Sequence, residues 1–96
     1  MSWELEFHPR IREQFEDIDE HILRRIKESV DRLKERPRLG KPLKNTQKPT
    51  RSLRFGTPGG EYRAVYVLVE RNEIVYVFHV DKREGDYDDL HRRYDL

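Results

Sequence analysis

The strongest structural signal in this sequence is EYRAVYVLVE at residues 61–70, followed by the polar pair Arg71-Asn72 and by EIVYVFHV at residues 73–80. Both runs are rich in Val and Tyr, which favour strands, and a short polar pair between two such runs is typical of a tight turn. The sequence therefore predicts a long β-hairpin. With the turn centred on Arg71 and Asn72, Arg63 is expected to lie opposite Val80.

The predicted hairpin is apolar on both faces. Alternate positions divide its apolar residues into Tyr62, Tyr66 and Leu68 on one face and Val65, Val67 and Val69 on the other. A pair of helices can cover only one of these faces, and a second apolar face that stays exposed indicates a partner. The alternative is that the C-terminal tail closes this face through Leu90 and Tyr94.

The N-terminal third predicts a strand and two helices. Residues 3–7 (WELEF) alternate between apolar and polar, as in a half-buried strand, and Pro9 suits the first turn of a helix. Asp17 and Asp19 are expected to begin a second helix after a tight break, and Pro37 and Gly40 to end it. One apolar stripe at helical spacing joins both helices: Ile11, Phe15, Ile18, Ile22, Ile26, Val30 and Leu33.

The remaining segments complete an α+β fold. Residues 38–50 are expected to form an extended basic loop, residues 51–55 a short strand, residues 56–60 a turn, and residues 86–96 a short C-terminal helix or tail. The prediction is a small antiparallel sheet in β-α-α-β-β-β order, packed against two N-terminal helices. A chain of 96 residues has room for one modest core, so we expect a single domain over residues 1–96.

Composition excludes several classes of protein. The chain has no cysteine, which removes disulfides, thiolate metal sites and cysteine nucleophiles. His8, His21 and His91 are scattered and show no metal-ligand spacing. No apolar run is long enough to span a bilayer, and the acidic first residues lack the order of a signal peptide. We therefore expect a soluble cytoplasmic protein without a membrane partner or a metal site.

The charge is strongly segregated although the net charge is only +1. Residues 36–54 contain seven Lys or Arg residues and no acid, whereas residues 1–20 are acidic. A basic stretch of this kind is typical of a surface that binds phosphate groups. A merely solvated loop is the alternative interpretation.

The predicted hairpin brings basic residues toward one end of the sheet. Arg54 on the preceding strand, Arg63 on the hairpin, and Arg83 and Tyr87 beyond it are expected to converge there. Guanidinium groups bind phosphate through two parallel hydrogen bonds, and a neighbouring aromatic ring can stack on a base. The alternatives are an ordinary ion pair between Arg63 and an acid such as Asp81, and a structural role for Tyr87.

Four short motifs in fixed order resemble the RelE/ParE toxin superfamily of type II toxin-antitoxin systems. They are PRLGKPLK at 37–44, LRFG at 53–56, EYRAVY at 61–66, and KRE at 82–84 followed by Tyr87. The resemblance covers nearly the whole chain and is closest to RelE-like mRNA interferases. It implies a ribosome-dependent endoribonuclease in which the 2′-hydroxyl of the RNA attacks the adjacent phosphate, without metal or cofactor. It also implies a RelB-like antitoxin, the ribosome and mRNA as partners.

The resemblance also implies residue roles. Arg63 matches the strand arginine that contacts the phosphate, Arg83 the arginine that aids the leaving group, Tyr87 the tyrosine that orients or stacks the substrate, and Arg54 a basic residue of the preceding strand. The other basic residues expected to contact RNA or the ribosome are Arg38, Lys41, Lys44, Lys48, Arg51 and Lys82.

One departure from the RelE pattern concerns the general base. RelE enzymes commonly have lysines at two alternate positions of the strand that here carries Ser52 and Arg54. An arginine stays protonated and cannot readily accept a proton, so Lys44, Lys48 or the ribosome remain candidates. His79, between two apolar strand residues, is more simply packed or hydrogen-bonded. The alternatives to a nuclease are a ParE-like toxin that binds gyrase and a degenerate toxin that acts only as a binding module.

Overall fold

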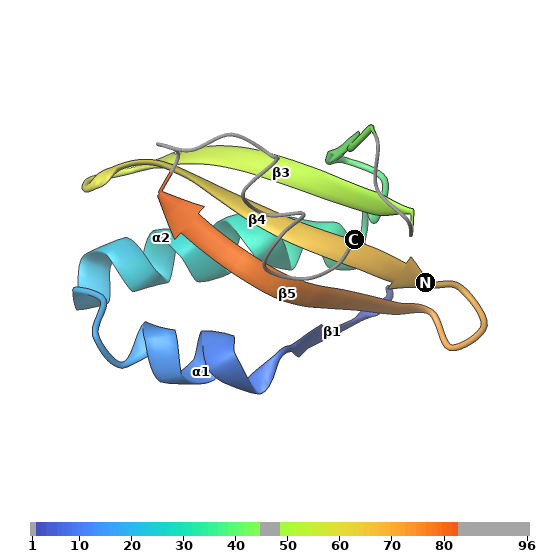
Figure 1. Ribbon diagram of the computed structural model, residues 1–96, viewed down its shortest axis with the longest axis horizontal. Coiled ribbons are helices and arrows are strands. Elements are labelled where there is room, and N and C mark those ends of the chain that lie inside the picture. The colour runs from blue at the N-terminus through green and yellow to red at the C-terminus, as the bar shows by residue number, and fades with distance from the viewer. Residues whose placement is uncertain (1, 45–48, 83–96) are drawn as a thin grey trace.

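The structure, a computed structural model, describes residues 2–44 and 49–82 (Figure 1). The elements follow one another as β1 (Glu4–Phe7), α1 (Pro9–Phe15), α2 (Glu20–Asp31), a 3₁₀ turn η1 (Arg32–Lys34), β2 (Lys41–Pro42), β3 (Thr50–Thr57), β4 (Gly60–Val69) and β5 (Ile74–Lys82). The predicted α+β class is confirmed. The expected C-terminal helix or tail lies outside the described residues.

Both helices begin where the sequence predicts. Pro9 occupies the first turn of α1, and His8 Nδ1 accepts a hydrogen bond from the backbone N–H of Arg10 at 3.1 Å. The first helix ends at Phe15, and after a short turn Asp19 is the N-cap residue of α2. The second helix ends at Asp31, earlier than Pro37, because the chain tightens into η1.

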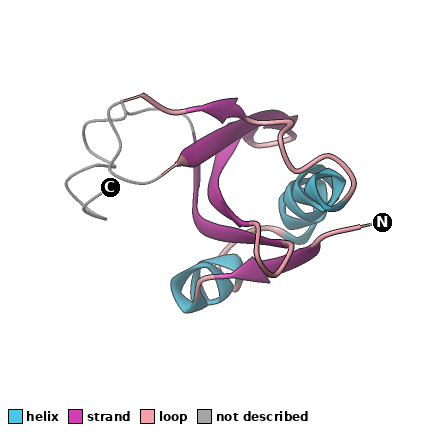
Figure 2. Ribbon diagram, turned by 90° about the vertical axis from the view of Figure 1, so that its right-hand side faces the viewer, coloured by secondary structure: helices cyan, strands magenta, loops and turns pink. Residues whose placement is uncertain are grey.

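The sheet has the order β1-β5-β4-β3-β2, and its twist is visible in Figure 2. β3, β4 and β5 pair antiparallel, as predicted, but β1 pairs parallel with β5, so the sheet is mixed. The expectation of a purely antiparallel sheet was therefore wrong. β5, the second strand of the hairpin, lies between β1 and β4, and no local pattern in the sequence encodes its long-range pairing with β1.

The segment expected to be only a loop contains the short strand β2. Lys41 pairs with Ser52 and Pro42 with Arg51, which makes β2 one edge of the sheet. A two-residue edge strand that contains proline fits the rule that proline is tolerated at sheet edges. It offers few unpaired backbone groups to other chains.

The helices cover one face of the sheet, with α2 behind β3 and β4 and α1 beside β5 (Figure 1). The main core lies between them and includes Ile11, Ile26, Val30, Leu53, Phe55, Tyr66 and Val77. A second cluster consists of buried Val65 and Phe78 with partly buried Leu43, Val67 and Tyr76. It lies on the side of the sheet away from α1 and α2, which we call the open face. The prediction that the hairpin is apolar on both faces is confirmed.

Tyr66 fixes the connection between the helices and the sheet. Its ring is fully buried, its hydroxyl donates to the backbone carbonyl of Pro37 at 2.8 Å, and it accepts from the N–H of Gly40 at 2.9 Å. Burial raises the pKa of Tyr66, although the Gly40 hydrogen bond and the nearby charge of Arg51 act in the opposite direction. The basic segment is therefore attached to the core before it enters β2.

Gly40→Ala is expected to lower the free energy of unfolding by about 1–3 kcal/mol, because overpacking a filled site costs that much. A Cβ at Gly40 would lie 2.7 Å from the Tyr66 hydroxyl and 2.9 Å from the Ser52 carbonyl oxygen. Denaturant unfolding measures the loss. Gly56→Ala is the matched control, since a Cβ there meets no atom within 4 Å. Equal effects of the two variants would contradict the packing argument.

Candidate functional site

The pairing of β4 with β5 decides which residues of β5 lie beside Arg63. From Val69 and Ile74 to Tyr66 and Val77 the pairing follows the sequence prediction, but a β-bulge between Val65 and Tyr66 then shifts it. Arg63 consequently pairs with Asp81, and the predicted pairing with Val80 was wrong by one residue. The cause is one extra residue on β5, which shifts the register of every pair beyond it by one position. His79 and Asp81 are thereby brought to the face that carries Arg63.

Arg54 and Arg63 lie directly opposite each other on β3 and β4. Directly opposed residues have Cβ atoms roughly 5 Å apart and point to the same side of the sheet, here the open face. Arg54 is exposed, whereas Arg63 is buried, with 4% of its side chain accessible. The predicted proximity of these two arginines is confirmed, and they differ sharply in access to solvent.

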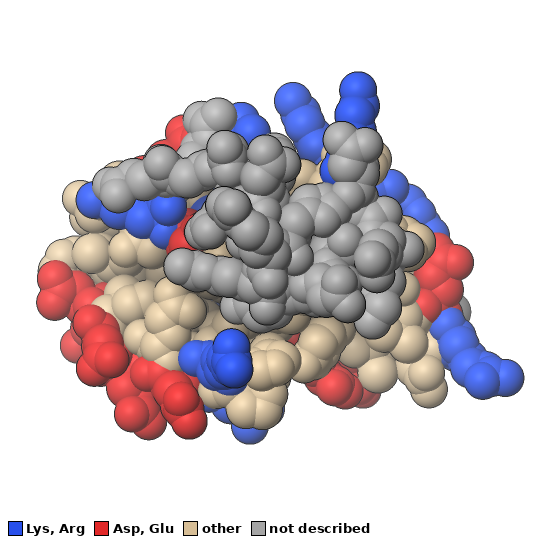
Figure 3. Space-filling view, viewed as in Figure 1, with Lys and Arg blue, Asp and Glu red and all other residues tan. Residues whose placement is uncertain are grey.

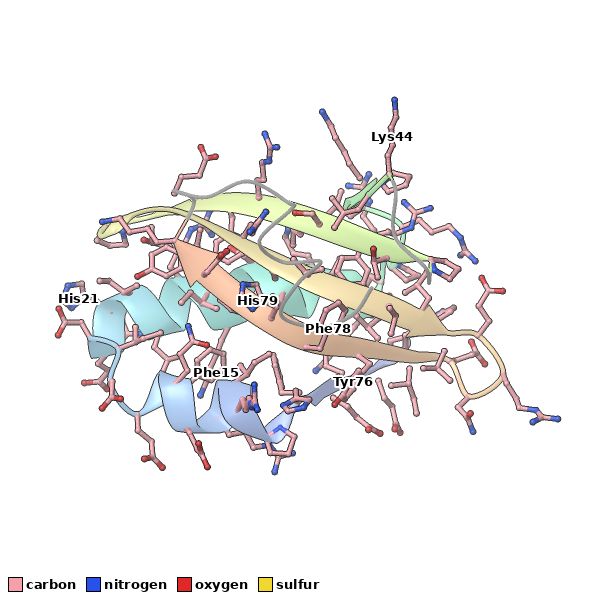
Figure 4. The ribbon with its side chains drawn as sticks, viewed as in Figure 1. Phe15, His21, Lys44, Tyr76, Phe78 and His79 are labelled. Atoms are coloured by element: carbon pink, nitrogen blue, oxygen red, sulfur yellow. The ribbon has the colours of Figure 1, made fainter. Side chains whose placement is uncertain are left out.

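Arg63 is bound to a carboxylate. Its Nε lies 2.9 Å from Asp81 Oδ1 and its Nη2 3.1 Å from Asp81 Oδ2, so the pair is bidentate. His79 Nε2 lies 3.1 Å from the same Oδ2. His79 is itself buried and lies next to Phe78 over β5, far from His21 at the start of α2 (Figure 4). The ion pair that the sequence left open as an alternative for Arg63 is present.

Two opposing effects set the pKa of Asp81. Burial would raise it, but the hydrogen bonds from His79 and Arg63 and the charges of both groups lower it below the ordinary aspartate value. Asp81 is therefore ionised wherever an ordinary aspartate would be, and its charge neutralises the buried guanidinium of Arg63.

The lowered pKa of Asp81 predicts a loss of stability in acid. A carboxyl group whose pKa is lower in the folded state stabilises the fold above its unfolded pKa, and this contribution disappears as the pH falls through the folded pKa. The wild type is therefore expected to have a higher free energy of unfolding than Asp81→Asn above pH 3.8, the ordinary aspartate pKa, and this advantage is expected to shrink as the pH falls below that value. Urea unfolding over a pH series measures this advantage. An advantage independent of pH would contradict the assignment.

Two of the predicted RNA-binding residues hold the basic segment in place. Arg51 Nη1 donates to the carbonyl of Gly40 at 2.7 Å and to that of Arg38 at 3.2 Å. Arg38 pairs with Glu70 and lies over the ring of Trp3, with its Cζ 6.0 Å from the ring centroid. Both side chains thus have structural contacts within the fold.

The other described basic candidates point outward. Lys41 on β2, Lys44 just beyond it, and Lys82 at the end of β5 are exposed. Blue side chains gather along the upper edge of the molecule in Figure 3, where Figure 4 places Lys44, while red ones gather near α1. The charge segregation seen in the sequence persists on the surface. Lys48, Arg83 and Tyr87 lie outside the described residues.

Ser52 stands where a RelE-like enzyme commonly has a lysine. Its side chain is buried on β3, two positions from Arg54, and Oγ has no hydrogen-bond partner within residues 2–44 and 49–82. A buried hydroxyl without a partner costs about 1–3 kcal/mol. Because serine is uncharged and this side chain is buried, Ser52 does not supply the positive charge that a lysine would supply at this position.

The described residues contain no cluster of three or more His, Cys, Asp or Glu side chains suited to a metal ion. A groove of about 580 Å³ lies between β1 and α2, lined among others by Trp3, Leu5, Lys27 and Val30. This groove is on the helix side of the sheet and does not involve the arginine pair. None of the helices in the described part is long and apolar enough to cross a membrane.

Comparison with known proteins shows the family of the chain. Residues 5–87 match the model of a family described as ParE toxin of type II toxin-antitoxin system, parDE. No curated protein matches the chain in a sequence search.

Solved structures of RelE toxins share the fold. A double mutant of the E. coli toxin RelE in the free state is 21% identical, with a TM-score of 0.75 and coverage of 98% of this chain and 99% of that one. The RelBE2 toxin-antitoxin complex of Mycobacterium tuberculosis contains a chain 28% identical, with a TM-score of 0.74 and coverage of 86% and 100%. The archaeal RelE-RelB complex of Pyrococcus horikoshii gives 18% identity, a TM-score of 0.66 and coverage of 90% and 100%. Since the family match extends over most of the sequence, the protein belongs to the RelE/ParE superfamily of toxins of type II toxin-antitoxin systems.

Proposed function

We propose that this toxin is a ribosome-dependent endoribonuclease that cuts mRNA and thereby inhibits translation. The observation that carries the proposal is the pairing of Arg54 with Arg63 at opposed positions of the open face. Two guanidinium groups on one side of a sheet suit a phosphodiester, since each can donate two parallel hydrogen bonds to phosphate oxygens.

The reaction needs charge stabilisation more than a cofactor. When the 2′-hydroxyl of the RNA attacks the adjacent phosphate, negative charge builds up on the phosphorane oxygens, and fixed cations lower the barrier. In this proposal Arg54 and Arg63 stabilise that charge, Arg83 aids the leaving group and Tyr87 orients the nucleotide. An arginine side chain does not readily accept a proton, so in this proposal Lys44, Lys48 or a group of the ribosome acts as the base.

Lys41, Lys44 and Lys82 are exposed and are the proposed contacts to RNA and ribosome, together with Lys48. Arg38 and Arg51 are better assigned to positioning, because Arg51 donates to the carbonyls of Arg38 and Gly40 and Arg38 pairs with Glu70. Such phosphate contacts give affinity without sequence information.

The apolar cluster of the open face supports an antitoxin partner. Val65, Phe78, Val67 and Tyr76 lie there, away from the helices. Complexes of similar toxins with RelB antitoxins have been solved for the M. tuberculosis and P. horikoshii proteins. We propose that a RelB-like antitoxin covers this cluster in the cytoplasm.

A second candidate is a ParE-like toxin that binds DNA gyrase without cutting RNA. The specific observation in its favour is the bidentate Arg63–Asp81 pair, since a guanidinium already neutralised by a carboxylate has less need of a phosphate. The matching family model is also named for ParE toxins.

Induction of the toxin without antitoxin separates the two candidates. We expect growth arrest together with primer-extension stops that map cuts within ribosome-bound messages. Growth arrest with intact messages and altered plasmid supercoiling would favour the gyrase candidate. Neither effect, in cells that contain the folded protein, would favour a degenerate toxin.

A further inference from the structure

We propose that the Asp81 carboxylate competes with phosphate for the guanidinium of Arg63. It pairs with Arg63 in the resting toxin and is replaced there by a phosphate of the RNA. The inference rests on the proposed function insofar as the anion is an RNA phosphate. It adds a regulatory contact within the same site.

In this ion pair, Asp81 occupies the groups of Arg63 that a phosphate would use. Asp81 uses both oxygens on the Nε and Nη2 edge of Arg63, at 2.9 and 3.1 Å. Carboxylate and phosphate bind a guanidinium through the same two-oxygen arrangement, so this edge cannot hold both at once. Even at another edge, the negative charge of Asp81 would oppose a phosphate held so close to it.

The accessibility of the two side chains places the carboxylate on the outside. Only 4% of the Arg63 side chain is accessible, against 29% of that of Asp81. Exposed Arg54 lies directly across from Arg63 on the neighbouring strand. An incoming phosphate can therefore reach Arg54 first, and it gains the second arginine only if Asp81 gives way.

His79 provides a place for the carboxylate when it leaves Arg63. Its Nε2 lies 3.1 Å from Asp81 Oδ2, in a contact that does not involve Arg63. The bulge on β5 brings this histidine to the open face. Asp81 can thus exchange one partner while keeping the other, which lowers the cost of the exchange.

The test titrates inorganic phosphate into the full chain by calorimetry at constant ionic strength. We expect Asp81→Asn to bind phosphate at least about tenfold more tightly than the wild type, because the competing charge is gone while Arg63 remains. The double variant Arg63→Gln, Asp81→Asn is the matched control and should lose that gain. Equal or weaker phosphate binding by Asp81→Asn would overturn the proposal and make Asp81 a positioning residue.

Asp81→Asn leaves a buried guanidinium without its counter-charge, so a second measurement covers a variant that folds only with a bound anion. If the variant is unfolded in chloride, it is dialysed into millimolar phosphate and followed by circular dichroism. Recovery of the fold in phosphate, absent in the double variant, supports the competition, and no recovery overturns it. The readout is binding, so a toxin that cuts no message would refute the proposed function without deciding this inference.

Discussion

Arg54→Ala is expected to reduce the rate of mRNA cleavage by about 100-fold, the usual cost of removing one group that stabilises charge in a transition state. Arg54 is exposed on β3 and directly opposite buried Arg63, so it is the member of this arginine pair that a phosphate can reach first. The measurement is cleavage of a defined message on programmed ribosomes, with wild type and variant at equal concentration.

The control for this loss is Arg24→Ala. Arg24 is also exposed but lies on α2, on the other side of the sheet. Its removal lowers the net charge by the same amount, so general attraction to RNA falls equally in both variants. We expect Arg24→Ala to cleave within a few-fold of the wild type. Similar losses in both variants would mean that Arg54 contributes only to the overall charge.

Arg63→Ala is expected to lower the free energy of unfolding by about 3 kcal/mol, because removing one member of a buried ion pair leaves the other charge without compensation. Asp81 would lose both hydrogen bonds from the guanidinium and keep only His79. Urea unfolding at neutral pH measures the loss. A change below about 1 kcal/mol would show that the pair behaves like an exposed surface salt bridge.

The double variant Arg63→Met, Asp81→Leu separates charge from packing. It removes both charges and restores apolar volume, and such replacements of buried pairs are often neutral or stabilising. We expect it to recover most of the stability lost in Arg63→Ala. This control also matters for activity, since loss of cleavage in Arg63→Ala alone would mix lost chemistry with lost folding.

Local patterns in the sequence predicted most of the fold. Pro9 and Asp19 begin the two helices as expected, and the alternation along residues 61–70 separates the covered face from the open face. The parallel pairing of β1 with β5 could not be predicted in this way, because it joins residues about seventy positions apart. Only packing of the whole chain decides which strand lies beside which.

The candidate site was predicted in part, for a similar physical reason. Arg54 and Arg63 were expected together, and the pairing of β3 with β4 places them opposite each other. The bulge changed the partner of Arg63 on β5, and nothing in the surrounding sequence, such as a glycine, marks its position. Burial of Arg63 could not be foreseen either, because charged residues are rarely buried and only a paired one is tolerated.

The most direct test of the central claim uses purified toxin, programmed ribosomes and an end-labelled message. We expect cuts only when ribosomes are present, with products that carry a 2′,3′-cyclic phosphate and a 5′-hydroxyl, since the 2′-hydroxyl of the RNA is the proposed nucleophile. Intact message in the presence of ribosomes, together with inhibition of DNA gyrase by the same preparation, would contradict it.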